Sequence, residues 1–516
     1  MKRKAKPVEE TIETVIQKPV FPHPATDEQK IIFEAVENTS DNLLIEARAG
    51  SSKTTTIVHA AKLLPPDSKI LFLAFNKHIK EELATKLPDY VKCYTSHGLG
   101  VSAIKRKYGD KIQFDGFKVN KIIDIKRKTW NLHYDMVVDL IPDYISDIKK
   151  LVDLCRLTMT FDKKYIEFLA EKHDIMFSEP KDINRVLSVL EKVIEDKKSY
   201  DYVDMVFMPA TDKAIWMFQY DYVFVDEAQD LCRAQQEMIR KVLKRDDFGT
   251  YKSRLISVGD PKQAIYSFAG SDAKSFEWFK KFNNPKLLTL AVTFRCAQKI
   301  VEHAQQLVPD IKARDGAPEG IVMKGSIEDA VDGDFILCRT TAPLVALFFE
   351  LLAQGKKCGI KGSDIGLSLI DLIKPYKSLA TMAAKLHNEL MQMQGMLRKK
   401  GITKFKEYGA YANLSDKIDV IKFLSKESND IDDLRKKISE IFTDTVSGIV
   451  LSTIHKSKGL EADRVFIIRP DKLPMRVSKP WMAEQEKNLI YVAMTRAKNS
   501  LIYDYEWTNE EEDETE

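Results

Sequence analysis

Short runs of apolar, β-prone residues recur along this chain, and they constrain its fold more than any other feature. Each run ends in polar or turn-forming residues, and stretches with helical apolar spacing separate many of them. Strands of a parallel sheet are buried on both faces, so they form continuous apolar runs instead of alternating patterns. The runs are NLLIEA (42–47), ILFLAF (70–75), YVFVDE (222–227), RLISVGD (254–260), KLLTLA (286–291), DFILCR (334–339), GIVLST (448–453), RVFIIR (464–469) and NSLIYDY (499–505).

Two groups of such runs predict two α/β domains, each a parallel sheet flanked by helices and wound like a nucleotide-binding sheet. The first four runs form one group, and the remaining five form the other. Two Lys- and Glu-rich segments with helical spacing, 101–205 and 373–444, interrupt these groups and predict two mainly helical inserted subdomains. We therefore expect the first domain at 1–100 and 206–285, the second at 286–372 and 445–503, and a separate tail at 504–516.

The net charge of +3 hides an asymmetry along the chain. The last 13 residues (504–516) carry eight acids and no Lys or Arg, so the preceding 503 residues carry +3 plus the eight compensated charges, or +11. A basic body favours a polyanionic partner. The acidic tail has the composition of a disordered, solvating segment, and docking to a partner is the alternative for it.

One basic segment, 105–128, contains nine Lys or Arg residues against three acids. Tyr108, Phe114 and Phe117 are interleaved with these charges, and Trp130 follows. Interleaved bases and aromatics fit a surface that binds nucleic acid. A solvated helical face over core aromatics fits equally well, and the sequence leaves both interpretations open.

Targeting and redox signals point to the cytoplasm. The six cysteines have no C-x-x-C spacing, which favours a reducing compartment and disfavours a zinc or iron–sulfur site. No apolar run approaches the roughly 18 residues of a membrane span, and no apolar segment follows the basic N-terminus as in a secretory signal. We expect no membrane association.

The stretch EARAGSSKTT (46–55) is similar to a phosphate-binding loop, G-x-x-x-x-G-K-[ST], with both glycines replaced. Ala47 and Ser52 occupy the glycine positions, ahead of Lys53 and Thr54. Backbone N–H groups at the start of the following helix would point at phosphates. A negative φ at Ser52 would let its hydroxyl donate to a phosphate, whereas a positive φ would cost about 1 kcal/mol or more.

The apolar run at 221–230 (DYVFVDEAQD) ends in two adjacent carboxylates, Asp226 and Glu227. In P-loop hydrolases a carboxylate at this place ligates Mg²⁺, and a second one activates the attacking water. A strand followed by a polar helix cap is the alternative. The phosphate-loop candidate, a carboxylate-terminated strand and a large insertion between them favour the nucleotide site.

Further motifs follow in a fixed order, and together they resemble the superfamily 1 DNA helicases of the UvrD/Rep type over most of the chain. The resemblance implies two RecA-like P-loop motor domains with ATP in the cleft between them. The motifs are TDEQ (26–29), LFLAFNKHIKEEL (71–83), YTSHGLG (94–100), DYVDMVFMP (201–209), VDEAQD (225–230), VGDPKQAIYSFAGS (258–271), TFRC (293–296), LSTIHKSKGLEADRVF (451–466, motif V) and EKNLIYVAMTRAK (486–498).

The same resemblance implies ATP and Mg²⁺ as cofactors and assigns roles to individual residues. Gln263 would sense the γ-phosphate, Arg295 and Arg496 would be arginine fingers, and Phe294 would stack on the adenine. The implied catalytic residues are Lys53, Asp226, Glu227, Gln263, Arg295 and Arg496. The implied metal ligands are Thr54 and Asp226. The implied nucleotide-binding residues are Gln29 (reading adenine), Ala47, Ala49, Gly50, Ser51, Ser52, Lys53, Thr54, Thr55, Phe294 and Glu461 (holding the ribose).

Nucleic-acid contacts are implied in the same way, with single-stranded DNA and junctions between single and double strands as partners. Tyr266 and Phe268 resemble an aromatic pair on which bases stack, and core packing is the alternative for Phe268. Replication or recombination proteins are candidate partners, and the motor is expected to work as a monomer. The implied DNA-binding residues are Phe75, Asn76, Thr95, His97, Tyr266, Phe268, Thr453 and His455.

Departures from the family pattern bear on the kind of motor. Ser52 replaces a glycine, Phe294 a tyrosine and Cys296 a serine, and both insertions are shorter than those of large bacterial members. The lack of a nuclease-like region after 486–498 disfavours a helicase–nuclease. The HKSKGLE form of motif V resembles the UvrD branch and implies 3′→5′ movement. The compact, Lys-rich chain suggests a phage or other viral member, which would act in a bacterial host cytoplasm if it is phage-encoded.

Two other functions stay open at this point. One is a translocase that displaces proteins from DNA without unwinding it. The other is a single-strand-binding protein with an inactive ATPase, for which Ser52 is the only support.

Overall fold

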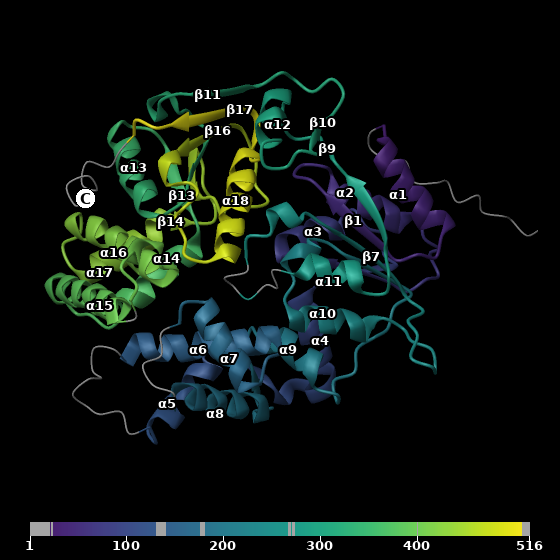
Figure 1. Cartoon of the computed structure of the whole chain (residues 1–516), viewed down its shortest axis with the longest axis horizontal. Helices are drawn as coiled ribbons and strands as arrows, with labels where there is room; N and C mark the ends of the chain where they lie inside the picture. The colour runs from purple at the N-terminus through teal and green to yellow at the C-terminus, as the bar shows by residue number, and fades with distance from the viewer. Residues whose placement is uncertain are drawn as a thin grey trace, which may run out of the picture.

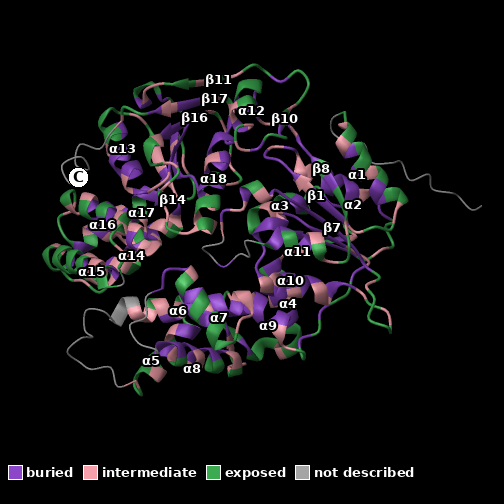
Figure 2. Cartoon of the chain, viewed as in Figure 1, coloured by how far each residue is buried: buried purple, intermediate pink, exposed green. Residues whose placement is uncertain are grey.

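Two parallel sheets lie side by side in the computed structural model, one built from the N-terminal elements and the other from the C-terminal ones (Figure 1). The structure describes residues 21, 24–130, 141–175, 181–266, 270, 274–399 and 401–507. Figure 2 shows buried residues concentrated on the strands and on the inner faces of the helices. The α/β fold with helix-flanked parallel sheets is therefore confirmed.

The first sheet has six strands in the order β3-β2-β6-β7-β1-β8, all parallel. Its strands are β1 (Leu43–Ala47), β2 (Ile70–Ala74), β3 (Val91–Thr95), β6 (Tyr222–Val225), β7 (Arg254–Gly259) and β8 (Lys286–Leu290). Its helices are α1 (Asp27–Asn38), α2 (Lys53–Lys62), α3 (Lys77–Ala84), α4 (Ser96–Tyr108), α9 (Asp204–Thr211), α10 (Arg233–Val242) and α11 (Ser275–Lys281). Apolar side chains fill both faces of the sheet, because its strands are buried on both sides.

Strand β8 corrects the predicted domain boundary. The sequence analysis assigns 286–291 to the second domain, but β8 pairs with β1, from Leu43 opposite Lys286 to Ala47 opposite Leu290. The chain therefore leaves the first domain only after β8. An apolar run indicates that a strand is buried, but it carries no information about which sheet the strand joins.

The second sheet has seven strands in the order β11-β17-β16-β12-β15-β13-β14, again all parallel. They are β11 (Ile321–Lys324), β12 (Phe335–Cys338), β13 (Cys358–Lys361), β14 (Phe442–Thr443), β15 (Ile449–Thr453), β16 (Ala462–Ile468) and β17 (Ala497–Asp504). Helices α12 (Gln298–Ala304), α13 (Ala342–Ala353), α14 (Ser363–Ile373) and α18 (Pro480–Met494) pack around it. A small parallel pair, β9 (Val292–Thr293) with β10 (Lys312–Ala313), lies between the two sheets in the chain.

The first insertion has a core of its own. Helices α5 (Lys118–Arg127), α6 (Ile141–Thr158), α7 (Lys163–Lys172) and α8 (Lys181–Glu195) lie together beside the first domain (Figure 1), and β4 (Gln113–Phe114) pairs with β5 (Ser199–Tyr200). Helix α4 crosses the predicted boundary at 101, because its apolar face belongs to the first-domain core. The exact limits of 101–205 stay a prediction.

The basic segment at 105–128 can be interpreted either as a surface that binds nucleic acid or as a solvated helical face over core aromatics, and its aromatic residues do not all fit the same interpretation. Phe114 and Phe117 are 45% and 67% exposed, so they are not core aromatics under a solvated face. Trp130 packs edge-on against Tyr144, 6.4 Å between ring centroids, and so has a structural role. Binding of nucleic acid by this surface stays a prediction.

A buried charge network fastens the first insertion to the first domain. The Arg156 guanidinium on α6 is fully buried and donates to Asp201 (2.8 and 2.9 Å) and to Asp204 (2.9 Å) at the start of α9. Lys118 on α5 donates to Asp204 at 2.7 Å. Buried charges are tolerated only when they are paired and hydrogen-bonded, so these groups fix one another's position.

The second insertion is part of the second domain's core. Its helices are α15 (Leu379–Lys399), α16 (Gly409–Lys426) and α17 (Ile431–Ile441). Met382, Ile418 and Leu434 pack in the same cluster as the sheet residues Ile360 and Leu451. The segment 373–444 is helical as predicted, but it also supplies the edge strand β14, so its helices cover the sheet directly.

The tail begins later than predicted. The side chain of Asp504 is buried, and one of its oxygens accepts from the backbone N–H of Ile327 at 2.7 Å. The indole Nε1–H of Trp507 donates to Glu350 at 2.8 Å. The expected start of the tail at 504 is therefore wrong, because β17 continues to Asp504 and Trp507 still contacts the second domain. Residues 508–516 of the predicted tail lie outside the described residues.

No helix in the described part of the chain is long and apolar enough to cross a membrane.

Short 3₁₀ turns complete the described structure. They span Gly109–Lys111, Ala228–Asp230, Pro261–Gln263, Ile327–Asp329, Phe405–Glu407 and Pro470–Lys472.

Arg156→Met is expected to destabilise the first insertion by about 3–5 kcal/mol, because it leaves Asp201 and Asp204 buried with one cation fewer. Amide exchange along α6 and urea denaturation measure the change. Lys192→Met, which removes an exposed partner of Glu195, is the control and should leave both unchanged. Equal effects of the two substitutions would contradict the anchoring role of the network.

Candidate functional site

A cavity of about 400 Å³ opens where the two domains meet, and it gathers residues from distant parts of the chain. Its walls come from the loop after β1, the ends of β2 and β6, and second-domain segments near Phe294, motif V and the end of α18. The predicted site residues that line it are Gly50, Ser51, Ser52, Lys53, Thr54, Thr55, Phe75, Asn76, Glu227, Gln263, Phe294, Arg295, Glu461 and Arg496.

The loop between β1 and α2 is pressed against the second half of the chain. Gly50 has φ +69°, and a Cβ there would lie 2.5 Å from Thr293 Oγ1 and 2.6 Å from Arg295 Cβ. The Gly50 carbonyl accepts from the backbone N–H of Phe294 at 2.8 Å. The Ala49 N–H donates to the Tyr491 hydroxyl on α18 at 3.0 Å. Glycine is therefore required here by a close approach as well as by its φ angle.

Ser52 adopts the left-handed conformation, with φ 58° and ψ 36°. The condition under which its hydroxyl could serve a phosphate, a negative φ, is not met, and the strained alternative holds. A Cβ costs roughly 1–2 kcal/mol in this region. Within this loop, a buried hydroxyl without a hydrogen-bond partner belongs to Ser51, a residue that lines the cavity.

The helix start and the end of β6 bring a hydroxyl, an ammonium and two carboxylates together. Thr54 Oγ1 donates to Asp226 Oδ2 at 3.0 Å, and Lys53 Nζ lies 3.6 Å from Glu227 Oε1. Thr54 and Asp226 fit Mg²⁺, which takes few protein oxygens and fills its remaining positions with water and phosphate oxygens.

The two carboxylates differ in their pKa values. Burial, reinforced by the neighbouring Glu227, raises the pKa of Asp226 to about 7. Burial acts in the same direction on Glu227, but the ammonium groups of Lys53 and Lys458 outweigh it and lower the pKa of Glu227 to about 2. Glu227 is therefore the more acidic of the two carboxyl groups and is ionised at neutral pH, as a general base that takes a proton from water must be.

Arg496 is a buried cation whose guanidinium is held by neutral oxygens. It donates to the carbonyls of Val492 (2.9 Å) and Leu460 (3.0 Å) and to the Thr495 hydroxyl (3.3 Å). Burial, followed by the charge of Arg295, lowers the pKa of Arg496 to about 9. Among the described ion pairs no carboxylate partners it. A buried cation held in this way is a prepared site for an anion.

Arg295 is paired within the second domain. Its Nε donates to Glu461 at 2.5 Å, and its Nη1 donates to the Thr495 carbonyl at 3.1 Å. Lys498 also contacts Glu461, at 3.0 Å. The structure thus brings the expected arginine finger and the expected ribose ligand into one ion pair, which a bound nucleotide would have to share.

Gln263 lines the cavity, but its amide is directed by Asp260. Gln263 Nε2 donates to Asp260 Oδ2 at 2.7 Å, and Asp260 is fully buried at the end of β7. The predicted γ-phosphate contact stays a prediction.

Gln29 does not line the cavities described here. Its Oε1 accepts from the Thr26 N–H, and its Nε2 donates to Thr56 Oγ1, both at 3.0 Å, so it ties the start of α1 to α2. A second cavity of about 940 Å³ opens beside it, lined in part by Thr26, Asp27 and Phe294. Phe294 lines both cavities, so its ring lies where the adenine of a nucleotide could extend from the first cavity into the second. The reading of adenine by Gln29 stays a prediction.

An aromatic–cation group connects the nucleotide cavity to the expected DNA residues. The rings of Phe75 and Tyr266 are stacked, 6.1 Å between centroids and 21° between planes. Lys458 Nζ lies 5.0 Å from the Tyr266 centroid, forms an ion pair with Asp230 and donates to the Gln263 carbonyl at 2.7 Å. Sequence reasoning missed Lys458 and Asp230, although both stand inside quoted motifs.

Three of the other expected DNA residues lie at or just after the ends of parallel strands. Thr95 caps α4 by accepting from the Gly98 N–H at 3.0 Å, and Asn76 caps α3 by accepting from the Ile79 N–H at 2.9 Å. Thr453 is buried at the end of β15.

The two expected DNA histidines differ in environment. His97 is exposed in the first turn of α4. Burial lowers the pKa of His455 to about 3, and its carbonyl accepts from the Tyr266 hydroxyl at 3.3 Å. Phe268 lies outside the described residues.

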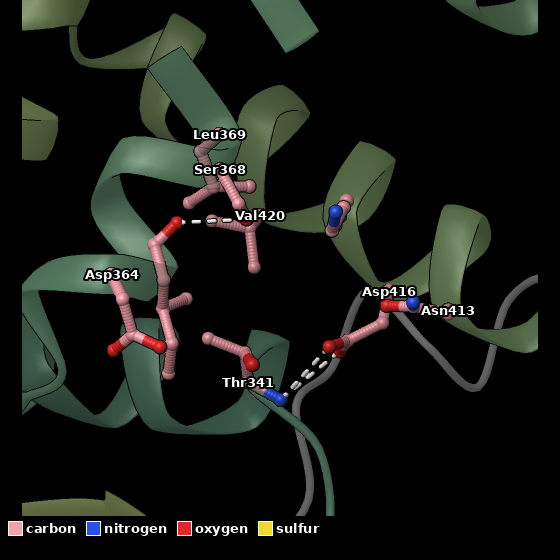
Figure 3. A pocket seen from close by; sticks show the side chains of 9 residues that line it. Thr341, Asp364, Ser368, Leu369, Asn413, Asp416 and Val420 are labelled. Atoms are coloured by element: carbon pink, nitrogen blue, oxygen red, sulfur yellow. Dashed lines mark hydrogen bonds between the residues drawn. The ribbon is translucent and has the colours of Figure 1, made fainter. Parts of the chain in front are cut away.

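A third cavity, of about 210 Å³, lies within the second domain (Figure 3). Asp416 on α16 points at the start of α13, where its carboxylate accepts from the backbone N–H groups of Thr341 (3.1 Å) and Ala342 (3.0 Å). A helix N-terminus attracts anions. Because Asp416 already occupies that place, the start of α13 is not free to bind a phosphate.

Together, the fold and the site define a two-domain P-loop protein whose second domain presents arginines to the nucleotide cleft of the first. Comparison with known families agrees. The model of the UvrD/REP helicase N-terminal domain matches residues 27–284, and that of the UvrD-like helicase C-terminal domain matches residues 360–507. The chain belongs to the UvrD/Rep helicase family.

Curated relatives include F-box DNA helicase protein 1 of Schizosaccharomyces pombe, 26% identical over 92% of this chain and 57% of the relative. F-box DNA helicase 1 of Gallus gallus is 22% identical over 92% of this chain and 48% of its own length. ATP-dependent DNA helicase Rep of Buchnera aphidicola is 25% identical over 53% of this chain and 44% of its own. The chain spans about half the length of these curated relatives.

Ser52→Gly is expected to raise the free energy of unfolding of the first domain by about 0.5–1 kcal/mol, because relief of the left-handed strain exceeds the entropy that glycine adds to the unfolded chain. Denaturant titration measures it. Ser52→Ala is the matched control: it keeps the Cβ and should give no gain. A loss of stability with glycine would show that Ser52 is not strained.

Proposed function

We propose that this protein is an ATP- and Mg²⁺-dependent DNA helicase that moves 3′→5′ along single-stranded DNA and unwinds duplex. One observation carries the proposal: Arg496 and Arg295 of the second domain line the same cavity as Lys53 and Glu227 of the first. A cleft that is complete only when two domains meet links nucleotide chemistry to domain movement.

The chain's own groups supply each part of phosphoryl transfer. Backbone N–H groups at the start of α2 and the Lys53 ammonium hold the phosphates, and Ser51 adds a buried hydroxyl. Mg²⁺, held by Thr54 and Asp226, would neutralise charge on the phosphate oxygens. Glu227, kept ionised by its cations, orients the attacking water and accepts its proton. Arg496 offers its guanidinium to the charge that develops on the transferred group.

Lys458 supports coupling between the nucleotide and a strand of DNA. It contacts the Gln263 carbonyl on the nucleotide side and the Tyr266 ring on the other. Tyr266 is partly exposed, and its aromatic ring is of the kind on which bases stack whatever their sequence. Movement of motif V relative to the first domain would therefore change the contacts of Lys458 both at Gln263, beside the nucleotide cavity, and at Tyr266, beside the expected DNA residues.

The proposed DNA substrate and the proposed direction of movement rest on the similarity of this chain to its relatives and on motif V. The relatives named as DNA helicases support DNA as the strand, and the HKSKGLE form of motif V supports 3′→5′ movement. Monomeric action, a cytoplasmic location and partners from replication or recombination complete the proposal. The two other functions, protein displacement without unwinding and strand binding without hydrolysis, are outcomes of the experiments below.

Glu227→Gln is expected to retain ATP binding and to lower the kcat of ATP hydrolysis by about 10²–10⁴-fold, the usual contribution of a general base. Hydrolysis by the unmodified protein should require Mg²⁺ and rise strongly with single-stranded DNA. Glu277→Gln, an exposed carboxylate on α11 paired with Lys280, is the control and should behave like the unmodified protein. Near-normal turnover by Glu227→Gln would show that another group orients the water.

Strand displacement on 3′-tailed, 5′-tailed and blunt duplexes separates the functions. A 3′→5′ helicase unwinds the 3′-tailed substrate and leaves the other two intact. Displacement of a bound protein from a single strand without unwinding would favour the translocase. Binding of single strands without ATP hydrolysis would favour the inactive ATPase, and unwinding from a 5′ tail would reverse the polarity.

A further inference from the structure

One buried cation at the cleft takes no part in the nucleotide contacts above. Arg48 follows β1 within the phosphate loop, its side chain is 8% exposed, and it lines neither the 400 Å³ nor the 940 Å³ cavity. A buried guanidinium stays charged and needs hydrogen-bond acceptors in a fixed geometry. The acceptors that hold the Arg48 guanidinium therefore indicate the role of this side chain.

The first partner lies across the cleft. Arg48 Nε donates to Asp310 Oδ1 at 2.8 Å and Nη2 donates to Asp310 Oδ2 at 2.5 Å, a two-pronged contact. Val308 and Ile311, on either side of Asp310, are buried in the second-domain core with Tyr491. Such a fork tolerates little relative displacement. The pair can therefore form only when the two domains are closed.

The second partner leads to the nucleotide cavity. Arg48 Nη1 lies 3.7 Å from Asp260 Oδ1, and Nη2 also donates to Glu46 at 3.0 Å. Asp260 Oδ1 accepts from the Lys262 N–H at 3.0 Å, and Oδ2 accepts from Gln263 Nε2 at 2.7 Å. One carboxylate thus joins the Arg48 guanidinium to the amide that lines the nucleotide cavity.

We infer that Arg48 is a positioning residue that couples closure of the two domains to the orientation of Gln263. In the closed arrangement Asp310 fixes the guanidinium fork, the fork places Nη1 at Asp260, and Asp260 holds the Gln263 amide. Opening withdraws Asp310 and leaves the guanidinium with Glu46, Asp260 and the Ala47 carbonyl, so it loses the two-pronged contact that fixes its plane. The role of Gln263 in this inference rests on the proposed function; the pair across the cleft does not.

Asp310→Asn tests the coupling with a small change at a half-exposed side chain. The kcat of DNA-stimulated ATP hydrolysis should fall about tenfold with KM for ATP changed less than about twofold, because a misplaced group costs rate while the binding residues stay in place. Asp310→Glu should recover most of the rate. Glu319→Gln, which breaks the exposed pair with Lys299 inside the second domain, should have no effect. Unchanged kcat in Asp310→Asn would overturn the inference.

A double-mutant cycle with Gln263→Ala tests the route through Gln263. If Arg48 and Asp310 act through this amide, Gln263→Ala lowers kcat much less in the Asp310→Asn background than in the unmodified protein. Multiplicative losses would show that the two groups act independently and would refute the relay.

Amide exchange without nucleotide separates this inference from the proposed function. The N–H groups of Ala49 and Phe294 make bonds across the closed contact, so both should exchange faster in Asp310→Asn and remain unchanged in Glu319→Gln. Unchanged exchange would refute the clamp. Absence of ATP hydrolysis by the unmodified protein would instead refute the proposed function, and the exchange experiment would still decide on the clamp.

Discussion

The rest of the structure depends on one close approach, between the loop after β1 and the segment that enters the second domain. Position 50 has no room for a Cβ, because Thr293 and Arg295 stand 2.5 and 2.6 Å from where it would lie. The backbone bond from Phe294 to Gly50 and the bond from Ala49 to Tyr491 extend this contact on both sides. With the two sheets held at this distance, arginines of the second domain reach a phosphate loop that belongs to the first.

Charge is concentrated at this approach, and its arrangement sets what the cleft can do. Glu227 and Arg48 are matched by opposite charges, whereas Arg496 is buried among carbonyl and hydroxyl oxygens. Taking such groups out of water is unfavourable, and the apolar cores of both sheets offset that cost. A buried guanidinium held by neutral oxygens favours an anion with several negative oxygens as its ligand. Burial thus turns ordinary side chains into a site that favours a phosphate ester and responds to the distance between domains.

The sequence predicted much of this, and its errors have physical causes. The order of the motifs predicts that Lys53, Asp226 and Arg496 belong to one nucleotide site. β8 was assigned to the wrong sheet, because an apolar run shows burial and not its neighbours. The sequence does not decide the φ angle of Ser52, since the left-handed conformation found here costs a serine only about 1–2 kcal/mol. Lys458 was missed, because a lysine in a motif does not reveal its partners.

By itself the sequence determined the fold class, and it predicts the two-domain plan and the groups of a nucleotide cleft. These follow from local properties: apolar runs, loop chemistry and the order of short motifs. Only the tertiary structure decided which sheet β8 joins, that the second insertion shares the core of its domain, and that Arg48 meets Asp310 across the cleft. Such contacts join residues up to 262 positions apart, and their geometry is set by packing of whole domains, which no local pattern encodes.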